Sequence, residues 1–140
     1  MIILDTNVVS EFMTSPPASS ALSWLNSQLT TSLYLTTITV AEIGFGLRTM
    51  PKGKRRDLLT EHFALFITTA FEQRILPFDI DAARIYGDVL GHRREIERPI
   101  SSLDGQIAAI ARSRGFSVAT RNIKDFEECQ IDLINPFAYD

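Results

Sequence analysis

The sequence predicts an α/β fold, a three-layer α/β/α sandwich with a central, mostly parallel sheet of four to five strands. Short apolar runs of strand length alternate with longer segments of helical periodicity, an order typical of a parallel sheet with helices on both faces. The first run, Ile2-Ile3-Leu4, contains no polar residue, as expected for a strand covered on both faces. A length of 140 residues predicts one domain over residues 1–140.

The first half of the chain is expected to hold two strands and four helical segments. Pro16-Pro17 ends the first helical segment because proline cannot continue a helix. Gly44 and Gly46, in the early turns of another helix, indicate close packing against a neighbouring backbone. The expected elements are a strand at 1–4, a short helix or turn at 7–12, a helix at 18–29, a strand at 33–36, a helix that opens at 39–43 and a long amphipathic helix at 55–71.

The second half is expected to continue the alternation. Pro77 indicates that its strand lies at a sheet edge, Asp79 or Asp81 is expected to cap the next helix, and Gly115 is expected to end a later helix in a left-handed conformation. The expected elements are a strand at 74–78, a helix from the cap to residue 90, a helix at 101–114, a strand at 116–120, a polar segment with a possible short helix at 121–128 and a last strand at 131–134.

The composition is that of an ordinary globular protein. Its 14 basic and 17 acidic residues give a formal net charge of −3, which argues against strong non-specific nucleic-acid binding by the whole domain but leaves room for a local basic patch. The single cysteine, Cys129, cannot form an internal disulfide and fits a reducing compartment. Polar residues interrupt the apolar run after position 4 and no secretory signal is present, so we expect a cytoplasmic protein without a membrane segment.

Three acidic residues share a similar local setting. Asp5 follows the first strand, while Glu42 and Asp104 fall in the expected first turns of two helices. Ligands of open α/β sheets bind beyond the carboxyl ends of the strands, so all three acids are expected to face one edge of the sheet. Each helix acid also has an alternative role as a simple cap. The segments that match the capping-box pattern are Thr39-x-x-Glu42 and Ser101-x-x-Asp104.

Asp5 is harder to explain as a structural residue. It starts no obvious helix, no lysine or arginine lies near it in the sequence, and a carboxylate at the end of a buried strand is unfavourable unless it is paired or bound to a cation. Three carboxylates at one edge would repel each other, and a hard divalent cation removes that conflict. We therefore predict that Asp5, Glu42 and Asp104 hold Mg²⁺ or Mn²⁺, which carboxylate oxygens favour.

Other catalytic chemistries fit the sequence less well. His62 and His92 belong to no zinc-spaced cluster, and neither a glycine-rich phosphate loop nor a Gly-x-Ser-x-Gly elbow is present. Two alternatives stay open. A haloacid-type aspartyl phosphatase also begins with a strand and an acid, but it requires a second acid where this chain has Asn7. A non-catalytic RNA-binding module of the same fold would use its acids only as caps.

Four segments together resemble the PIN-domain family, and more narrowly the VapC-type toxins of bacterial toxin–antitoxin pairs. They are Leu4-Asp5-Thr6-Asn7, Thr39-Val40-Ala41-Glu42, Asp104-Gly105-Gln106-Ile107-Ala108-Ala109 and Ala119-Thr120-Arg121-Asn122. Their order and spacing extend the resemblance over nearly the whole chain. The resemblance implies a metal-dependent endoribonuclease that is inhibited by a cognate antitoxin. It also implies a homodimer, and a higher assembly in which the antitoxin is bound to operator DNA.

The resemblance further implies roles for single residues. The residues that match catalytic positions are Asp5, Glu42 and Asp104, as acids around the cation, and Thr6 and Thr120, as small polar residues after the first and fourth strands. The family often has another acid two residues later, where this chain has Asn122. Asn122 stays a candidate catalytic residue because an amide can orient a water or accept one bond, but it brings no charge, which speaks against a second tightly held cation. Asp125 is a lesser candidate for that role, with a cap or a solvated loop acid as the alternative.

Contact with RNA requires positive charge, and one turn region is rich in it. The cluster consists of Arg48, Lys52, Lys54, Arg55 and Arg56, and we call it the basic cluster. Cations near the start of a helix oppose its dipole, so phosphate or antitoxin binding is an interpretation alongside that of a solvated charge run. Arg121 is the stronger candidate for a phosphate contact, with an ion pair to Asp125 or Glu128 as the alternative.

Apolar residues flank the same turn. Some of them are expected to stay exposed and to form an interface with a second copy or with an antitoxin, and the alternative is that all of them lie in the core. These residues are Phe45, Leu47, Met50, Phe63, Phe66 and Phe71.

Overall fold

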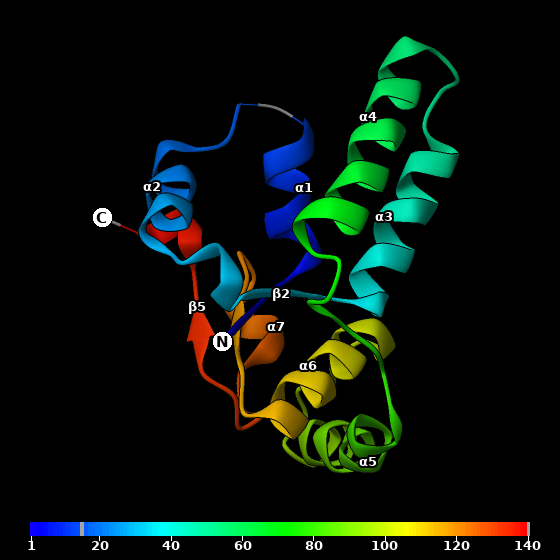
Figure 1. Cartoon of the computed structure of the whole chain (residues 1–140). Helices are drawn as coiled ribbons and strands as arrows, with labels where there is room; N and C mark the ends of the chain where they lie inside the picture. Colours follow the sequence, from blue (N-terminus) through cyan, green and yellow to red (C-terminus); the bar gives the residue numbers. More distant parts are fainter. Residues whose placement is uncertain (15, 140) are drawn as a thin grey trace.

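The computed structural model of the protein describes residues 1–14 and 16–139. An all-parallel sheet lies at the centre of this part of the chain (Figure 1). Its strands are β1 (Ile2–Leu4), β2 (Leu33–Thr36), β3 (Ile75–Leu76), β4 (Ser117–Ala119) and β5 (Leu133–Ile134), in the order β3-β2-β1-β4-β5. The predicted fold class is confirmed. The edge position of β3, which Pro77 indicated, is confirmed as well.

Helices connect the strands. The α-helices are α1 (Thr6–Thr14), α2 (Ser19–Ser27), α3 (Thr37–Thr49), α4 (Lys54–Leu65), α5 (Ile80–Glu95), α6 (Ser102–Arg114) and α7 (Ile123–Phe126). Shorter turns are the 3-10 segments η1 (Thr30–Ser32) and η3 (Pro136–Ala138) and the π-helical η2 (Phe66–Ala70). The long helix expected at 55–71 is therefore α4 with a π-helical continuation. None of the helices among the described residues has the length and apolarity needed to cross a membrane.

The sheet separates two hydrophobic cores. Ile3 belongs to the core that includes Val89 of α5, whereas the next residue, Leu4, belongs to the core that includes Trp24 of α2. Successive side chains of a strand point to opposite faces, so the apolar run of β1 is buried on both sides as predicted. This double burial fixes the central strand, and with it the position of Asp5 at its carboxyl end.

The close packing predicted at Gly44 and Gly46 is wrong. Both glycines are exposed on α3, and nothing lies within 4 Å of a Cβ added at either position. A close approach occurs instead at Gly105 of α6, where an added Cβ would lie 2.3 Å from Leu90 Cδ1 of α5. A glycine in the sequence does not reveal which face of its helix is covered, and only Gly105 of these three is on a covered face.

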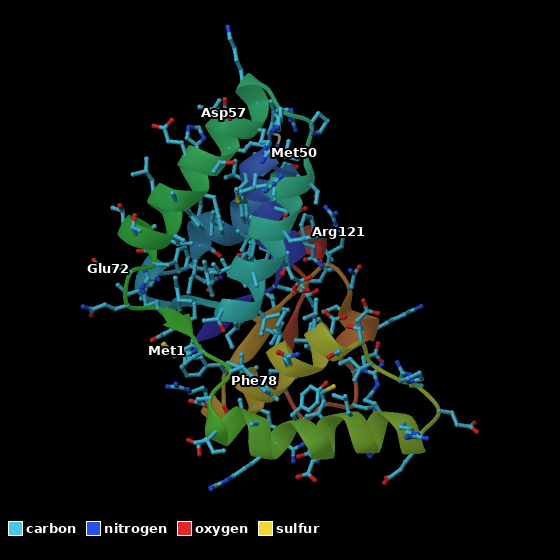
Figure 2. The ribbon with its side chains drawn as sticks, turned by 90° about the vertical axis from the view of Figure 1, so that its right-hand side faces the viewer. Met1, Met50, Asp57, Glu72, Phe78 and Arg121 are labelled. Atoms are coloured by element: carbon cyan, nitrogen blue, oxygen red, sulfur yellow. The ribbon has the colours of Figure 1, made fainter. Side chains whose placement is uncertain are left out.

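Helices α3 and α4 form a hairpin that extends away from the sheet (Figure 1). Met50 and Asp57 lie at its tip, whereas Arg121 lies nearer the sheet (Figure 2). The basic cluster spans the end of α3, the turn and the start of α4. The hairpin therefore carries its positive charge at the end that is remote from the sheet.

Candidate active site

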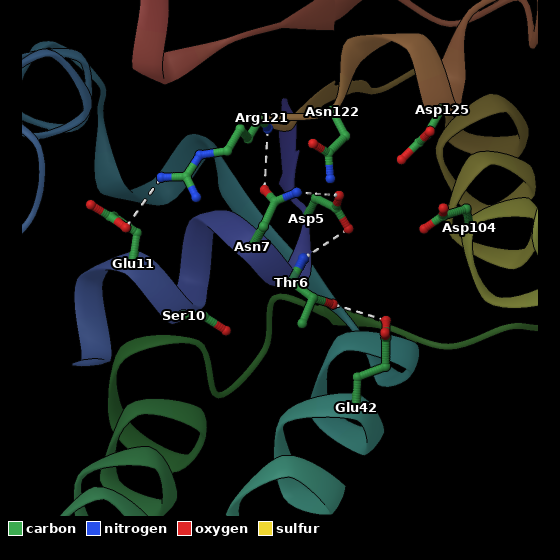
Figure 3. Close-up of a pocket in the computed structure, with 10 residues that line it drawn as sticks. All are labelled: Asp5, Thr6, Asn7, Ser10, Glu11, Glu42, Asp104, Arg121, Asn122 and Asp125. Atoms are coloured by element: carbon green, nitrogen blue, oxygen red, sulfur yellow. Dashed lines mark hydrogen bonds and ion pairs between the residues drawn. The ribbon is translucent and has the colours of Figure 1, made fainter. Parts of the chain in front are cut away.

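The predicted acids converge on one pocket at the carboxyl edge of the sheet (Figure 3). Asp5 reaches it from the end of β1, Glu42 from α3 and Asp104 from α6. The pocket has a volume of about 490 Å³. Its lining residues are Asp5, Thr6, Asn7, Ser10, Glu11, Glu42, Asp104, Arg121, Asn122 and Asp125. Residues separated by up to 120 positions in the sequence are thus brought together by the parallel sheet.

Asp5 stands where β1 turns directly into α1. Its N–H donates to the carbonyl of Ala119 (2.9 Å), which continues the pairing with β4, and its own carbonyl accepts from Val8 N–H (3.0 Å), which opens α1. The expectation that Asp5 starts no helix at once is therefore wrong. The reason is that Thr6 and Asn7, which read as polar site residues, are also the first residues of α1.

The Asp5 carboxylate is buried and held by neutral donors. It is 5% exposed, and it accepts hydrogen bonds from Thr6 N–H (2.8 Å), the Thr120 hydroxyl (2.8 Å) and Asn7 Nδ2 (3.3 Å). Burial raises the pKa of Asp5 to about 6; the Thr120 and Thr6 bonds oppose this rise, and the charges of Asp104 and Glu42 add to it. Asp5 is therefore a carboxylate whose negative charge the protein itself leaves poorly compensated.

Glu42 occupies a different place in its helix from the one predicted. The N-cap of α3 is Thr36, whose hydroxyl accepts from Thr39 N–H (3.1 Å), so Glu42 lies in the second turn and caps nothing. The capping-box interpretation of Thr39 and Glu42 is wrong because the helix starts directly at the end of β2. Glu42 Oε1 instead accepts a hydrogen bond from the Thr6 hydroxyl (2.9 Å), and this bond ties α3 to α1.

Asp104 lies in the capped first turn of α6 and also lines the pocket. Ser101 caps α6, with its hydroxyl accepting from Asp104 N–H at 3.2 Å. Asp104, and not Ser101, is the residue that lines the pocket. Burial raises the pKa of the Asp104 carboxyl, the hydrogen bond with Ser101 lowers it, and the nearby charge of Asp125 raises it. Capping therefore fixes the backbone of Asp104 and leaves its carboxylate at the pocket.

Thr120 and Asn122 extend the site from the end of β4. The fully buried Thr120 hydroxyl donates to Asp5 and accepts from Asn122 N–H (3.0 Å) and Asn7 Nδ2 (3.3 Å). Asn122 lines the pocket, and so does Asp125 in α7, next to Asp104 (Figure 3). The segment after β4 thus contributes a neutral amide at residue 122 and a carboxylate at residue 125.

Arg121 lines the pocket but has a different partner from those expected. Its guanidinium forms an ion pair with Glu11 of α1 (3.3 Å), rather than with Asp125 or Glu128, and it stacks over the Phe137 ring with the guanidinium carbon 3.9 Å from the ring centroid. Glu11 is 110 residues away in the sequence, so no local pattern could reveal this pairing. Arg121 is held at the rim of the pocket.

The basic cluster does not line the acidic pocket. Among the residues of a separate surface pocket on the hairpin are Lys52 and Arg56, together with Asp57 and Glu61. Arg56 also donates to the carbonyl of Met50 (3.4 Å). The structure therefore separates the two groups of candidate substrate-binding residues: Arg121 is at the pocket, and the basic cluster is at the hairpin tip.

Three pocket residues were given no role on the basis of sequence, namely Asn7, Ser10 and Glu11. Asn7 donates to Asp5 and accepts from Arg121 N–H (3.2 Å), and Glu11 pairs with the Arg121 side chain. Their spacing of four residues puts them on one face of α1. That spacing, directly after Asp5, is the signal that could have identified them.

The chemistry of the pocket fits a hard divalent cation. Its candidate ligands are carboxylate oxygens, and the cation among its lining residues, Arg121, is already paired with Glu11. Across the described part of the chain, no three acidic, histidine or cysteine side chains form a compact metal cluster. Mg²⁺ usually retains several waters and binds through one or two carboxylates, so a partly hydrated ion suits carboxylates that line a pocket of this size.

Comparison with known proteins identifies the family. The family model of the PIN domain matches residues 2–130 of this chain, a span that includes every residue lining the pocket. The chain belongs to the PIN-domain family. This PIN domain is 44% identical to the VapC ribonuclease Y4jK of Sinorhizobium fredii, over 98% of each chain. It is 36% identical to the toxin FitB of Neisseria gonorrhoeae, over 98% of this chain and 99% of FitB.

Solved structures show the same PIN fold. The crystal structure of FitAcB from Neisseria gonorrhoeae has a TM-score of 0.93 at 36% identity and covers 99% of each chain. The structure of FitAB bound to an IR36 DNA fragment has a TM-score of 0.94 at the same identity, over 100% of this PIN domain and 98% of that chain. The predicted family resemblance is therefore confirmed by both sequence and structure.

Proposed function

We propose that this PIN-domain protein is a metal-dependent endoribonuclease and the toxin of a toxin–antitoxin pair. The observation that carries the proposal is the Asp5 carboxylate, which is buried beside Glu42 and Asp104 with no basic side chain bonded to it among the described residues. The names of two relatives, a VapC ribonuclease and a toxin, point to the same activity.

Asp5 and Asp104 would hold one Mg²⁺ or Mn²⁺ with the help of Glu42. When bound, such an ion offsets the clustered negative charge, polarises a phosphate oxygen and lowers the pKa of water. Asn122 adds no charge, so the proposal includes one tightly held ion rather than two. Asp125 is the residue that could add a further carboxylate oxygen to the site.

Neutral hydroxyl groups position these carboxylates for hydrolysis. The Thr120 hydroxyl fixes Asp5 through its Oδ2 atom, and the Thr6 hydroxyl fixes Glu42 through its Oε1 atom. We assign to Glu42 the orientation of the water that attacks phosphorus as the phosphodiester P–O bond breaks. Because Thr6 and Thr120 are uncharged, they orient the acids without neutralising them, and the acids keep their charge for a cation.

RNA would be held by Arg121 at the pocket and by the basic cluster at the hairpin tip. Stacking on Phe137 pre-orders the Arg121 guanidinium at the rim, where it can contact a phosphate. The cluster lies at the far end of the α3–α4 hairpin, so only an extended RNA could contact both regions. Because the domain carries a net charge of −3, these local cations would supply most of the attraction to RNA.

The proposed partners are a cognate antitoxin and a second copy of the chain. FitB is named a toxin, and solved relatives include FitAB bound to a DNA fragment and a DNA-bound VapBC from Salmonella typhimurium. Of the apolar residues expected near the turn, Leu47, Phe63 and Phe71 are buried, whereas Phe45 is 62% exposed. Phe45 is therefore the member of that set that best fits an interface.

The test is digestion of total RNA by the purified protein, with and without a chelator. We expect cleavage that stops with chelator and returns with Mg²⁺ or Mn²⁺, and at least a 100-fold slower reaction for Asp5→Asn and Asp104→Asn. Asp88→Asn, at an exposed position of α5, is the matched control and should cleave normally. Equal cleavage by all the variants would refute the proposal. Metal-independent RNA binding without products would instead favour a non-catalytic module, and hydrolysis of small phosphate esters would favour a phosphatase.

A further inference from the structure

We propose that Arg93 is a positioning residue. It holds α7, whose Asp125 lines the pocket, to the α5–α6 connection that leads to Asp104. The inference rests on the proposed function of the pocket. Arg93 lies in the last turn of α5 and is 4% exposed. Among the described residues it is the one buried cation, yet it does not line the pocket. A buried charge of this kind requires partners.

The Arg93 guanidinium binds backbone carbonyls from two segments that are distant in the sequence. Its Nε donates to the carbonyl of Arg98, in the α5–α6 connection. One terminal nitrogen donates to the carbonyls of Asp125 (2.8 Å) and Glu127 (3.1 Å), at the end of α7, and lies 3.7 Å from Cys129 Sγ. A planar guanidinium with five N–H groups in a fixed fork can serve such dispersed acceptors at once, whereas an ammonium group cannot.

The clamped segments contain backbone that needs external support. Glu97 has φ 59° and Glu128 has φ 62°, in the left-handed region that side chains disfavour. Each of them adjoins a residue whose carbonyl Arg93 binds, namely Arg98 and Glu127. Such conformations persist only where the surrounding structure over-determines them. At Glu97, two backbone bonds that end α5 supply part of this constraint: Arg98 N–H donates to the Arg93 carbonyl (2.9 Å) and Glu97 N–H to the Arg94 carbonyl (3.1 Å). The side-chain bonds from Arg93 add to it in both segments.

Both clamped segments lead to the pocket. Asp125 lines the pocket next to Asp104 (Figure 3), and the connection that contains Arg98 continues to Ser101, the cap that fixes Asp104. Arg93 therefore couples the two carboxylate-bearing segments through their backbones. Groups that orient metal-binding side chains from outside typically change metal affinity by about 10- to 100-fold when they are removed.

The experiment compares the full chain with Arg93→Met, Arg93→Lys and Val89→Ala. The Met variant keeps an unbranched apolar stem of similar bulk without N–H groups, and the Lys variant keeps the charge without the fork. Val89 is a fully buried residue of α5, four positions earlier, in the hydrophobic core. It therefore provides a control for general destabilisation. The readouts are Mn²⁺ affinity by isothermal titration and amide hydrogen exchange across residues 121–130.

Both Arg93 variants should bind Mn²⁺ at least about 10-fold more weakly and exchange at least about 10-fold faster in residues 121–130. Val89→Ala should show neither selective effect. Three results would each overturn the inference. Arg93→Met could bind Mn²⁺ as tightly as the parent, its hydrogen exchange could rise uniformly as in Val89→Ala, or Arg93→Lys could recover the full Mn²⁺ affinity and protection from exchange. If Arg93→Met does not fold, Arg93→Lys alone decides between these outcomes. Failure of the parent itself to bind Mn²⁺ would refute the metal proposal, and with it this inference.

Discussion

The Thr120 hydroxyl donates a 2.8 Å hydrogen bond to Asp5 Oδ2 across 115 residues of sequence. Thr120 follows β4 and Asp5 follows β1, and these neighbouring strands run parallel in register. The bond therefore joins two strand ends at the edge of the sheet where Asp5 lines the pocket, and it also stabilises the ionised form of a buried acid.

Replacing Thr120 by valine should weaken the fold mainly at neutral pH. The substitution keeps the shape and removes a hydrogen bond to a carboxylate, so we expect a loss of about 2 kcal/mol in the free energy of unfolding at pH 7.5. Near pH 4.5, where Asp5 is largely protonated in the folded protein, the loss should be smaller by about half. Urea denaturation at both pH values measures this. Thr60→Val, at an exposed position of α4, is the control, and an equal loss at both pH values would contradict the prediction.

Asp5→Asn should stabilise the metal-free protein at neutral pH. The pKa of Asp5 is raised from 3.8 to about 6, so the folded state binds more protons than the unfolded state between these values. The free energy of unfolding therefore falls as the pH rises through this window, by up to about 3 kcal/mol, and stays low above it. Removing the charge should restore about 1 to 2 kcal/mol at pH 7.5 and little at pH 4, as measured by urea denaturation with chelator present.

Saturating Mg²⁺ should make the parent protein more stable than Asp5→Asn, the reverse of the order expected without metal. The ion would bind the folded parent through Asp5 and stabilise it, whereas Asp5→Asn should gain much less. Because protons compete with the ion for Asp5, the affinity for Mg²⁺ should fall about 10-fold per pH unit below pH 6. Thermal unfolding with and without Mg²⁺ at several pH values tests both expectations. A Mg²⁺ effect that is the same in both proteins would place the ion elsewhere.

The salt dependence of RNA binding should show which cations contact phosphate. Each phosphate contact adds about 0.7 to the slope of log affinity against log salt for single-stranded nucleic acid. Replacing Lys52 and Lys54 by glutamine should therefore lower the slope by about 1.4, and Arg121→Gln should lower it by about 0.7. Binding is measured in an Asp104→Asn background to prevent cleavage, with Arg84→Gln on α5 as the control. An unchanged slope for the lysine variants would remove the hairpin tip from the RNA interface.

Two glycine substitutions should change stability by different amounts. Gly105→Ala would place a methyl group against the end of the Leu90 side chain, which must shift, so its cost should offset the gain in helix propensity and leave a net loss of at most about 1 kcal/mol. Gly87→Ala, on an exposed face of α5 with nothing within 4 Å, should stabilise it by about 0.5 to 1 kcal/mol. Chemical denaturation of both variants measures the difference. Equal effects would mean that α5 and α6 are not in tight contact at Gly105.

Local patterns were sufficient to predict where the acids meet. The apolar run of β1 identified a doubly buried strand, and the carboxyl edge of a parallel sheet then determined the meeting point of Asp5, Glu42 and Asp104. The start of α3 was placed too late because Thr39 and Thr36 are both acceptable caps. Their choice depends on where β2 ends, and this is set by pairing with β1 and β3.

Long-range polar partners could not be predicted in the same way. Arg121 pairs with Glu11 and Arg93 binds carbonyls more than 30 residues away, and neither pairing leaves a periodic trace in the sequence. Arg93 in particular lies among other arginines and glutamates that resemble a solvated helix end. Its burial depends on how the end of α7 and the segment after it approach Arg93, which is a property of the complete tertiary structure.

Because β1 has only three residues, the alternation of its side chains between the two faces of the sheet tolerates no shift in position. Ile3 and Leu4 belong to opposite cores. Inserting or deleting one residue just before Asp5 would therefore either exchange the faces of Ile3 and Leu4 or move the Asp5 carboxylate away from Glu42 and Asp104. An in-frame insertion or deletion of one codon at this point could therefore inactivate the protein although every acidic residue is retained.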